Sequence, residues 1–364
     1  MVGCDCLKNR VYWIDIARAI GMLLIIIGHS LGKYTLTPIG SVVFMVNVTI
    51  FFVLSGYLYK QKKFSKQAVN LCYNVLIPYI ITAIGIVLIS EFVNHFGQFK
   101  IFTTVGGAEN IIERIFFGMG TNVKLIFTNH IMPQIGAVWF LVAFFWTNII
   151  FNVLHSLLTG KKLIFYFSTI IVAVFGVYLT KWGMLPWSLN AALIGVFFMG
   201  AGSIIKGTSI FNRHKMIIFL FCLVLCVFSS LQGYFWFDVA YTQNVVYAAL
   251  GGISGSIAIM LMSQGIEVLN IRYNLKFIID ALAWFGRYSL PVLCVHIIEL
   301  SNTRGAEIIS NHLMGHSSLL IMFVIIIYRI VFVTIGVIVL RHLPILKSIY
   351  FNREFPFYWQ KRDS

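Results

Sequence analysis

Charge is the scarcest property of this sequence. Asp, Glu, Lys and Arg together make up 11% of the 364 residues, whereas they make up about 25% of a soluble globular domain. Hydrophobic residues make up 59%. This balance excludes a water-soluble globule. Repeated apolar runs of about 20 residues instead predict an all-α integral membrane protein whose helices pack against one another in the bilayer.

Other signals are also absent. The six cysteines lack metal-finger spacing, and Cys222 and Cys226 lie inside an apolar run, where cysteine behaves as a small hydrophobic residue. The sequence shows no repeat of fixed period, no low-complexity segment and no room for a separate soluble domain. We therefore expect one membrane domain over residues 1–364, without a bound metal or resident cofactor.

The apolar runs divide the chain into candidate spans. Windows of about 19 residues predict ten transmembrane helices, at residues 12–31, 40–59, 71–94, 134–158, 163–180, 188–205, 216–232, 245–266, 284–300 and 317–340. The long connection between the third and fourth, residues 95–133, contains the mildly amphipathic stretch AENIIERIFFGM. We expect this stretch to form an interfacial helix or a lid.

Basic residues far outnumber acidic ones, 27 against 12, which gives a net charge of +15. With both termini in the cytoplasm, 18 of the basic residues fall in inner loops and termini and six in outer loops. Lys and Arg concentrate on the cytoplasmic side of membrane proteins, so this bias predicts both termini inside a multi-pass protein of the cytoplasmic membrane. The bias explains the basic excess without a nucleic-acid partner.

The first predicted helix carries three ionisable residues. Arg18 and His29 are eleven positions apart, or three turns plus about 20°, so both leave one helix face roughly 16 Å apart. Asp15 shares that face, three residues before Arg18. A charge within a span must be paired or hydrated, so this face is a candidate site for an elongated anionic ligand. Alternatively, Arg18 snorkels to the inner headgroups beside Asp15, and His29 lies at the outer interface.

The spacing of Arg18 and His29 resembles the opening of membrane acyltransferase family 3, a basic residue, ten residues and then His. FFVLSGYL at 51–58 is similar to the family's FFxxSGY signature, and KQKKFSK at 60–66 to its basic loop. VWFLVAFF at 138–145 resembles its WFL span, and LPWSLNAALIGVFFMGAG at 185–202 its proline-led span. FGRYSLPVLCVHIIE at 285–299 resembles its late segment, although Leu293 and Cys294 stand where the family often has Tyr.

This resemblance implies an O-acyltransferase that moves an acyl group, usually acetyl, from cytoplasmic acetyl-CoA to a hydroxyl of a surface or lipid-linked glycan. His29 would act as the base that deprotonates the acceptor, or as the nucleophile that carries the acyl group. Arg18 would hold the phosphates of the acyl-CoA, whose pantetheine arm is about as long as the separation of Arg18 and His29. Asp15 would orient Arg18 or contact the donor. Succinyl-CoA stays open as a second donor.

Two small residues follow in the second predicted span. Ser55 and Gly56 belong to the FFVLSGYL stretch. They either contact substrate or let two helices approach closely, since small residues serve helix crossings in membranes.

A second polar stripe lies in the ninth predicted span. It consists of Arg287, Ser289, His296 and Glu299. These side chains could bind acceptor hydroxyls. The alternative is a structural ion pair between Glu299 and Arg329 of the last span.

A secondary transporter or glycan flippase is the main alternative to an enzyme. Intramembrane Arg, His and Glu also mark the pathways of protons and anionic substrates. The sequence shows neither an inverted repeat nor a matched pair of broken spans. Outer-loop aromatics, including Trp236, could stack on sugars or anchor the protein at the interface.

Overall fold

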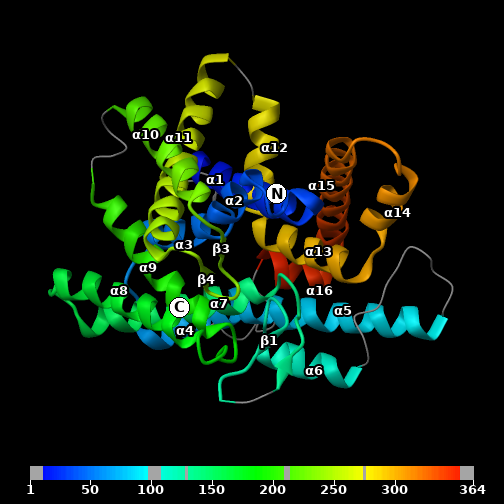
Figure 1. The fold of residues 1–364 in the computed structure, drawn as a ribbon, viewed down its shortest axis with the longest axis horizontal. Helices are drawn as coiled ribbons and strands as arrows, with labels where there is room; N and C mark the ends of the chain where they lie inside the picture. Colours follow the sequence, from blue (N-terminus) through cyan, green and yellow to red (C-terminus); the bar gives the residue numbers. More distant parts are fainter. Residues whose placement is uncertain (1–10, 97–107, 128–129, 209–213, 274–275, 353–364) are drawn as a thin grey trace.

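The computed structural model describes residues 11–96, 108–127, 130–208, 214–273 and 276–352. Most of these residues are helical (Figure 1). The α-helices are α1 (Tyr12–Ser30), α2 (Pro38–Val46), α3 (Thr49–Leu58), α4 (Phe64–Leu71), α5 (Ile77–Phe96), α6 (Ala108–Phe117), α7 (Trp139–Leu157), α8 (Lys162–Leu179), α9 (Leu189–Lys206), α10 (Lys215–Leu231), α11 (Val245–Tyr273), α12 (Lys276–Arg287), α13 (Ser289–Asn302), α14 (Gly305–His312), α15 (Ser318–His342) and α16 (Pro344–Lys347).

Short elements connect these helices. A 3-10 turn, η2 (Gly32–Tyr34), follows α1, and two π-helical turns, η3 (Cys72–Leu76) and η4 (Ser348–Asn352), adjoin α5 and α16. Two small antiparallel pairs join β1 (Val123–Lys124) to β2 (Ile131–Met132) and β3 (Phe235–Trp236) to β4 (Tyr241–Thr242). The helix α6 falls on the amphipathic stretch predicted in the 95–133 connection.

The all-α membrane fold predicted from the sequence is confirmed, but the count of ten spans is not. In the described part of the chain, eight helical segments are long and apolar enough to cross a membrane: Tyr12–Ser30, Pro38–Leu58, Phe64–Phe96, Trp139–Leu157, Lys162–Leu179, Leu189–Lys206, Val245–Leu269 and Ser318–His342. The seventh predicted span, α10, has 17 residues, about 26 Å of helix, which is short of the roughly 30 Å hydrocarbon core. The cytoplasmic placement of both termini stays a prediction.

The ninth predicted span is not one straight helix. Residues 284–300 fall on α12 and α13, whose axes meet at 74° around Tyr288. Pro291, the third residue of α13, has no backbone N–H and its ring would clash with the carbonyl four residues earlier, at Arg287. A straight helix therefore cannot continue through this point, and the chain turns sharply instead.

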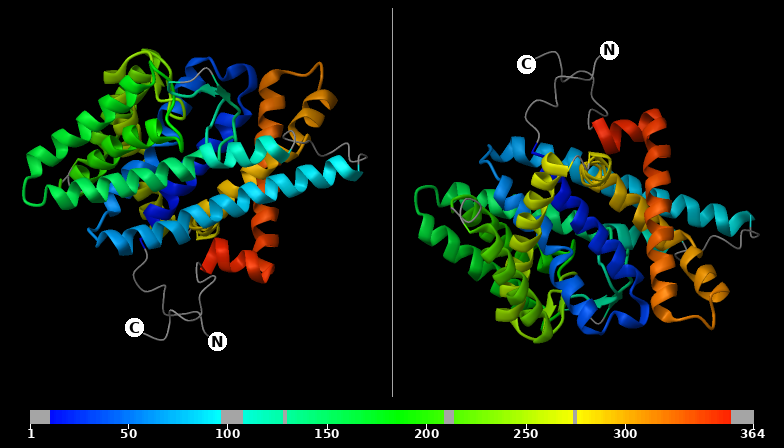
Figure 2. Two further views of the ribbon diagram at one scale, coloured as in Figure 1. Left: turned by 90° about the horizontal axis from the view of Figure 1, so that it is seen from below. Right: turned by 90° about the horizontal axis from the view of Figure 1, so that it is seen from above.

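Helix α1 lies in the middle of the bundle, packed against α2, α3, α11, α12, α13 and α15 (Figures 1 and 2). Two glycines allow this dense packing. A Cβ on Gly21 would lie 2.9 Å from the Ile50 side chain, and a Cβ on Gly286 would lie 1.7 Å from the backbone oxygen of Asp15. The ionisable face of α1 is thus enclosed by other helices rather than directed to lipid.

Candidate active site

A basic pocket of about 430 Å³ surrounds Arg18. Its polar lining consists of Arg18, Ser55, Tyr59, Lys60, Lys62, Gln67, Asn74, Asn148, Arg287 and Ser289. Four of these residues are cations, and none of the described lining residues is Asp or Glu. Asp15 is buried and does not line the pocket. Its carboxylate lies 3.6 Å from the Arg18 guanidinium and forms an ion pair with it. This composition suits an anionic ligand with several negative groups.

The bend between α12 and α13 supplies two lining residues of the basic pocket. Arg287 ends α12 and Ser289 begins α13, so the turn at Tyr288 directs both toward Arg18. The Nε of Arg287 is buried and has no hydrogen-bond partner among the described residues. A buried cationic donor without a partner is costly unless a ligand satisfies it.

The loop that carries Lys60 and Lys62 is fixed to neighbouring helices. The Tyr59 hydroxyl donates to Asn152 Oδ1 at 2.6 Å, and Asn152 Nδ2 donates to the Lys62 backbone oxygen at 3.2 Å. Lys206 Nζ donates to the Tyr59 backbone oxygen at 3.0 Å. These bonds hold the two lysines at the rim of the basic pocket.

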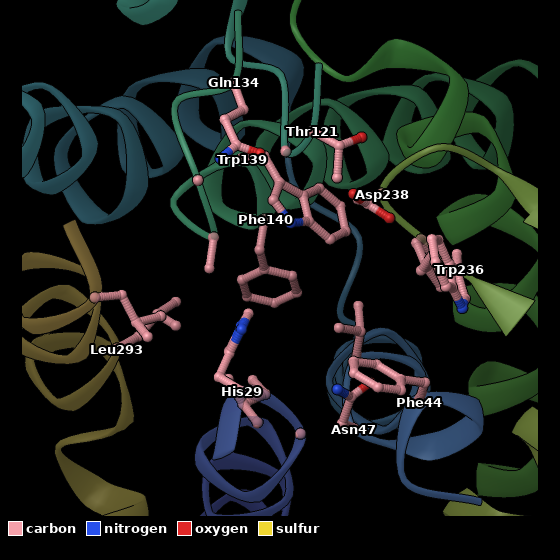
Figure 3. A pocket seen from close by; sticks show the side chains of 18 of the residues that line it. His29, Phe44, Asn47, Thr121, Gln134, Trp139, Phe140, Trp236, Asp238 and Leu293 are labelled. Atoms are coloured by element: carbon pink, nitrogen blue, oxygen red, sulfur yellow. The ribbon is translucent and has the colours of Figure 1, made fainter. Parts of the chain in front are cut away.

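A second cavity of about 650 Å³, the histidine pocket, lies at the other end of α1. Its lining includes His29, Asn47, Thr121, Gln134, Trp139 and Asp238, with Phe44, Phe140 and Trp236 as further aromatic surfaces (Figure 3). None of the described lining residues is Lys or Arg. The His29 side chain is exposed to this cavity. The two pockets therefore differ sharply in charge.

Behind His29 lies a buried polar cluster of His296, Glu299 and Arg329. The rings of His29 and His296 have centroids 5.5 Å apart, and His296 Nδ1 lies 3.5 Å from Glu299 Oε2. Arg329 Nε lies 3.2 Å from the same oxygen. Arg329 Nη1 donates to the His29 backbone oxygen and, at 2.8 Å, to Ser30 Oγ.

This cluster holds the last turn of α1 in place. The final carbonyls of a helix have no partner within the helix, and Arg329 supplies one to His29. Gly32 follows in the left-handed conformation (φ +52), which ends the helix cleanly. Glu299 and Arg329 therefore form an ion pair. This pair is the structural role that the sequence offered for Glu299 as the alternative to acceptor binding.

Phe140 and Leu293 line both pockets and form the wall that they share. Phe140 is held by edge contacts with Phe51 and Phe52, with ring centroids 5.6 Å apart in each pair. Arg18 lies on one side of this wall and His29 on the other. Among the residues that the structure describes, Phe140 and Leu293 are the two that separate a molecule in the basic pocket from the cavity lined by His29.

The family model described as an acyltransferase domain, that of acyltransferase family 3, matches residues 11–341. The chain belongs to acyltransferase family 3. Neither the search of curated proteins nor that of solved structures found a match. The family resemblance predicted from the sequence motifs is therefore confirmed over nearly the whole chain.

Seven of the nine predicted site residues of this acyltransferase fall into three groups, and Asp15 and Gly56 line neither pocket. Arg18, Ser55, Arg287 and Ser289 line the basic pocket, and His29 lines the histidine pocket. His296 and Glu299 lie in the buried cluster behind His29 and line neither of the two pockets. The bend at Tyr288 thus divides the second polar stripe between two places.

Gly56 lies at a helix crossing, away from both pockets. A Cβ at this position would lie 1.8 Å from the Met199 backbone oxygen, so Gly56 lets α3 and α9 touch. Its neighbour Ser55 faces the other way and donates to Asn148 Oδ1 at 3.0 Å, on the wall of the basic pocket. The two adjacent residues therefore serve different surfaces.

Sequence reasoning missed most of the acyltransferase's histidine pocket, above all Asp238. Its carboxyl lies in the β3–β4 connection, outside the spans, and burial raises its pKa above the ordinary value of 3.8. The backbone amide of Val239 and the Thr121 hydroxyl partly oppose this rise. The one available signal was an acidic residue inside an otherwise aromatic stretch, FWFD at 235–238.

Proposed function

We propose that this acyltransferase moves an acetyl group from acyl-CoA in the basic pocket to a hydroxyl in the histidine pocket, with His29 as the base. The basic pocket would face the cytoplasm and the histidine pocket the outer side of the cytoplasmic membrane, where a glycan or lipid-linked sugar supplies the hydroxyl. The charge bias of the loops supports this orientation. Succinyl-CoA stays an alternative donor.

The observation that carries this proposal is that α1 contributes to two pockets, one lined by four cations and the other by a histidine without any Lys or Arg among the described residues. Arg18, Lys60, Lys62 and Arg287 offer cations to the phosphates of coenzyme A. His29 stands beyond the shared wall, about 16 Å along α1 by helix geometry. The pantetheine arm is long enough to bring the thioester from the cations to the imidazole.

In the proposed reaction His29 first accepts a proton and then returns it. The unprotonated imidazole nitrogen takes the proton of the acceptor hydroxyl as its oxygen attacks the thioester carbonyl carbon. The tetrahedral intermediate collapses, the carbon–sulfur bond breaks, and the imidazolium gives its proton to the departing thiolate. The products are the ester and the free thiol of coenzyme A. In the covalent variant, His29 attacks the thioester first and the acceptor then takes the acyl group from the imidazole.

Replacement of His29 tests the catalytic assignment. His29→Ala should lower kcat by about 10² to 10⁴-fold, the usual contribution of a general base. The assay is thiol release from acetyl-CoA by purified protein in lipid nanodiscs, with His316→Ala, an exposed histidine, as the matched control. Wild-type turnover by a folded His29→Ala protein would refute the assignment. Radiolabelled acyl group retained by denatured wild-type protein, but not by His29→Ala, would identify the covalent variant.

The donor pocket is tested separately. Arg18→Ala should raise KM for acetyl-CoA, because it removes one charged contact, while Arg304→Ala at the surface should not. In cells, mass spectrometry of the surface glycan with and without the gene should show the loss of an acetyl ester. An unchanged glycan, together with no acyl transfer by purified protein, would favour the transporter alternative.

A further inference from the structure

Asp238 is placed in the histidine pocket by a rigid hairpin. The β3–β4 hairpin buries Phe235 and Phe237 in the core, and the Phe237 ring stacks on Phe52 with centroids 5.0 Å apart. Ala240 adopts a left-handed conformation (φ +51), and its backbone N–H donates to the Phe237 oxygen at 3.1 Å, which closes the turn. Asp238 therefore reaches the cavity from an anchored turn rather than from a loose loop.

The wall around Asp238 is closely packed. A Cβ on Gly120 would lie 2.6 Å from Trp139 and 2.9 Å from the Asp238 side chain. Glycine is therefore required at position 120 for Trp139 and Asp238 to pack against this backbone. Gln134 is held beside them because its backbone N–H donates to Asn122 Oδ1 at 2.9 Å. Figure 3 shows Asp238, Trp139 and Gln134 across the cavity from His29.

The side chains around Asp238 combine aromatic surfaces with hydrogen-bonding groups. Trp236 presents an exposed aromatic surface to the cavity, and the mostly buried Trp139, which stacks on Phe237, adds a second aromatic wall. Gln134 and Asp238 present hydrogen-bonding groups in the same cavity. A carboxylate can accept several hydrogen bonds from neighbouring hydroxyls. A ring with one apolar face and polar hydroxyls at its edge, as in a sugar, satisfies both kinds of surface.

The charge of the histidine pocket restricts the ligand further. Asp238 is the one carboxylate among its described lining residues, and no Lys or Arg accompanies it. An anionic sugar would face this carboxylate without a compensating cation, and like charges at a partly desolvated site are unfavourable. A neutral or amino sugar meets no such penalty.

We propose that Asp238 binds the acceptor and selects against negative charge, so that the sugar acylated in the histidine pocket is neutral or basic. This inference rests on the proposed function. Asp238 acts on the acceptor alone, because it lies on the opposite side of the Phe140 and Leu293 wall from the cations that serve the donor.

The test measures acceptor-stimulated thiol release from acetyl-CoA by protein in nanodiscs. The probes are methyl hexopyranosides and methyl uronosides, each uronoside compared with its own amide, which has nearly the same shape but no charge and carries an N–H donor in place of one acceptor oxygen. Asp238→Ala should raise the acceptor KM about 10- to 100-fold, the loss of a charged hydrogen bond, while KM for acetyl-CoA changes less than about twofold. Asp238→Asn should reduce the preference for the amide over the uronate by about tenfold. Asp280→Asn, an exposed aspartate on α12, is the matched control.

Three outcomes would overturn this proposal. Wild-type protein could use the uronates as well as their amides, no sugar in the panel could stimulate thiol release, or Asp238→Ala could leave the acceptor KM unchanged. The role of Asp238 can be refuted while the proposed function stands. Thiol release that depends on His29, combined with any of these outcomes, refutes the role of Asp238 alone. Thiol release that does not depend on His29 refutes the proposed function itself.

Discussion

The buried ion pair of Glu299 and Arg329 offers the sharpest test of how this site is held together. Both side chains are almost completely inaccessible, with exposures of 2% and 7%. Removing one charge of such a pair leaves the other buried without compensation, which costs about 3–5 kcal/mol. Glu299→Gln and Arg329→Gln should each lower the free energy of unfolding by about this amount.

The double variant should cost less than the two single variants together. With both charges absent, neither is left unpaired, so we expect a coupling free energy of about 1–3 kcal/mol. Arg329→Gln should also lower kcat more than Glu299→Gln does, because only Arg329 contacts the His29 backbone oxygen and Ser30. Arg329→Lys should not restore full activity, since an ammonium cannot reproduce the planar guanidinium fork.

Unfolding in mixed micelles, followed by tryptophan fluorescence, measures the stability of the wild type, the two single Gln variants and the double variant. Thiol release per folded molecule measures the activity of these proteins and of Arg329→Lys. Strictly additive losses, or single losses below about 1 kcal/mol, would show that the pair is not the buried, coupled unit described above. Equal loss of kcat in the two single variants would refute the idea that Arg329 positions the end of α1.

Further predictions concern other parts of the site. Arg287→Gln should raise KM for acetyl-CoA about tenfold or more without changing the acceptor KM, because it removes a charged donor from the basic pocket. Gly56→Ala should destabilise the fold, because its Cβ would overlap the Met199 backbone oxygen, whereas Gly85→Ala, which has open space, should gain up to about 1 kcal/mol. Asp238→Asn should raise the thermal midpoint at about pH 7, because the native carboxyl has a raised pKa and stability falls as pH rises from 3.8 through that value.

Each of these predictions has a contrary result. An unchanged donor KM in Arg287→Gln would mean that the basic pocket does not hold the donor. Equal stability of the two glycine variants would mean that α3 and α9 do not touch at Gly56. The gain of Asp238→Asn should shrink as the pH falls through the raised pKa to below 3.8, where the aspartate is protonated in both the folded and the unfolded state; a gain that persists in acid would have another cause.

The apolar runs predicted the helices well, because a bilayer requires long uninterrupted apolar segments. Residues 12–31 were expected for the first span and α1 covers Tyr12–Ser30. The bend at Tyr288 was not predicted, because a 19-residue hydropathy window averages over the proline that causes it. Pro291 was a usable signal, since proline in the first turn of a helix often marks a new start.

The part of the site on helices was predictable, because spacing placed the residues of α1 and the family motifs added Ser55, Arg287 and Ser289, whereas the part on connecting segments was hidden. Helix geometry placed Asp15, Arg18 and His29 on one face from their spacing alone. The convergence of Asp238 and Gln134 on His29 depends on how distant connections fold back over the bundle. Periodicity within a segment carries no information about such contacts. An acidic residue in a short loop therefore looks in the sequence like any solvent-exposed side chain.

The wall formed by Phe140 and Leu293 has an electrical consequence for the proposed reaction. The phosphates of the donor stay on one side of this wall, the acyl group passes outward, and His29 returns the acceptor's proton inward to the thiolate. Neither side of the membrane gains or loses net charge. Moving one elementary charge through 100 mV is worth about 2.3 kcal/mol, so release of the proton on the acceptor side would make turnover depend steeply on voltage. Turnover through this wall should instead be indifferent to the membrane potential.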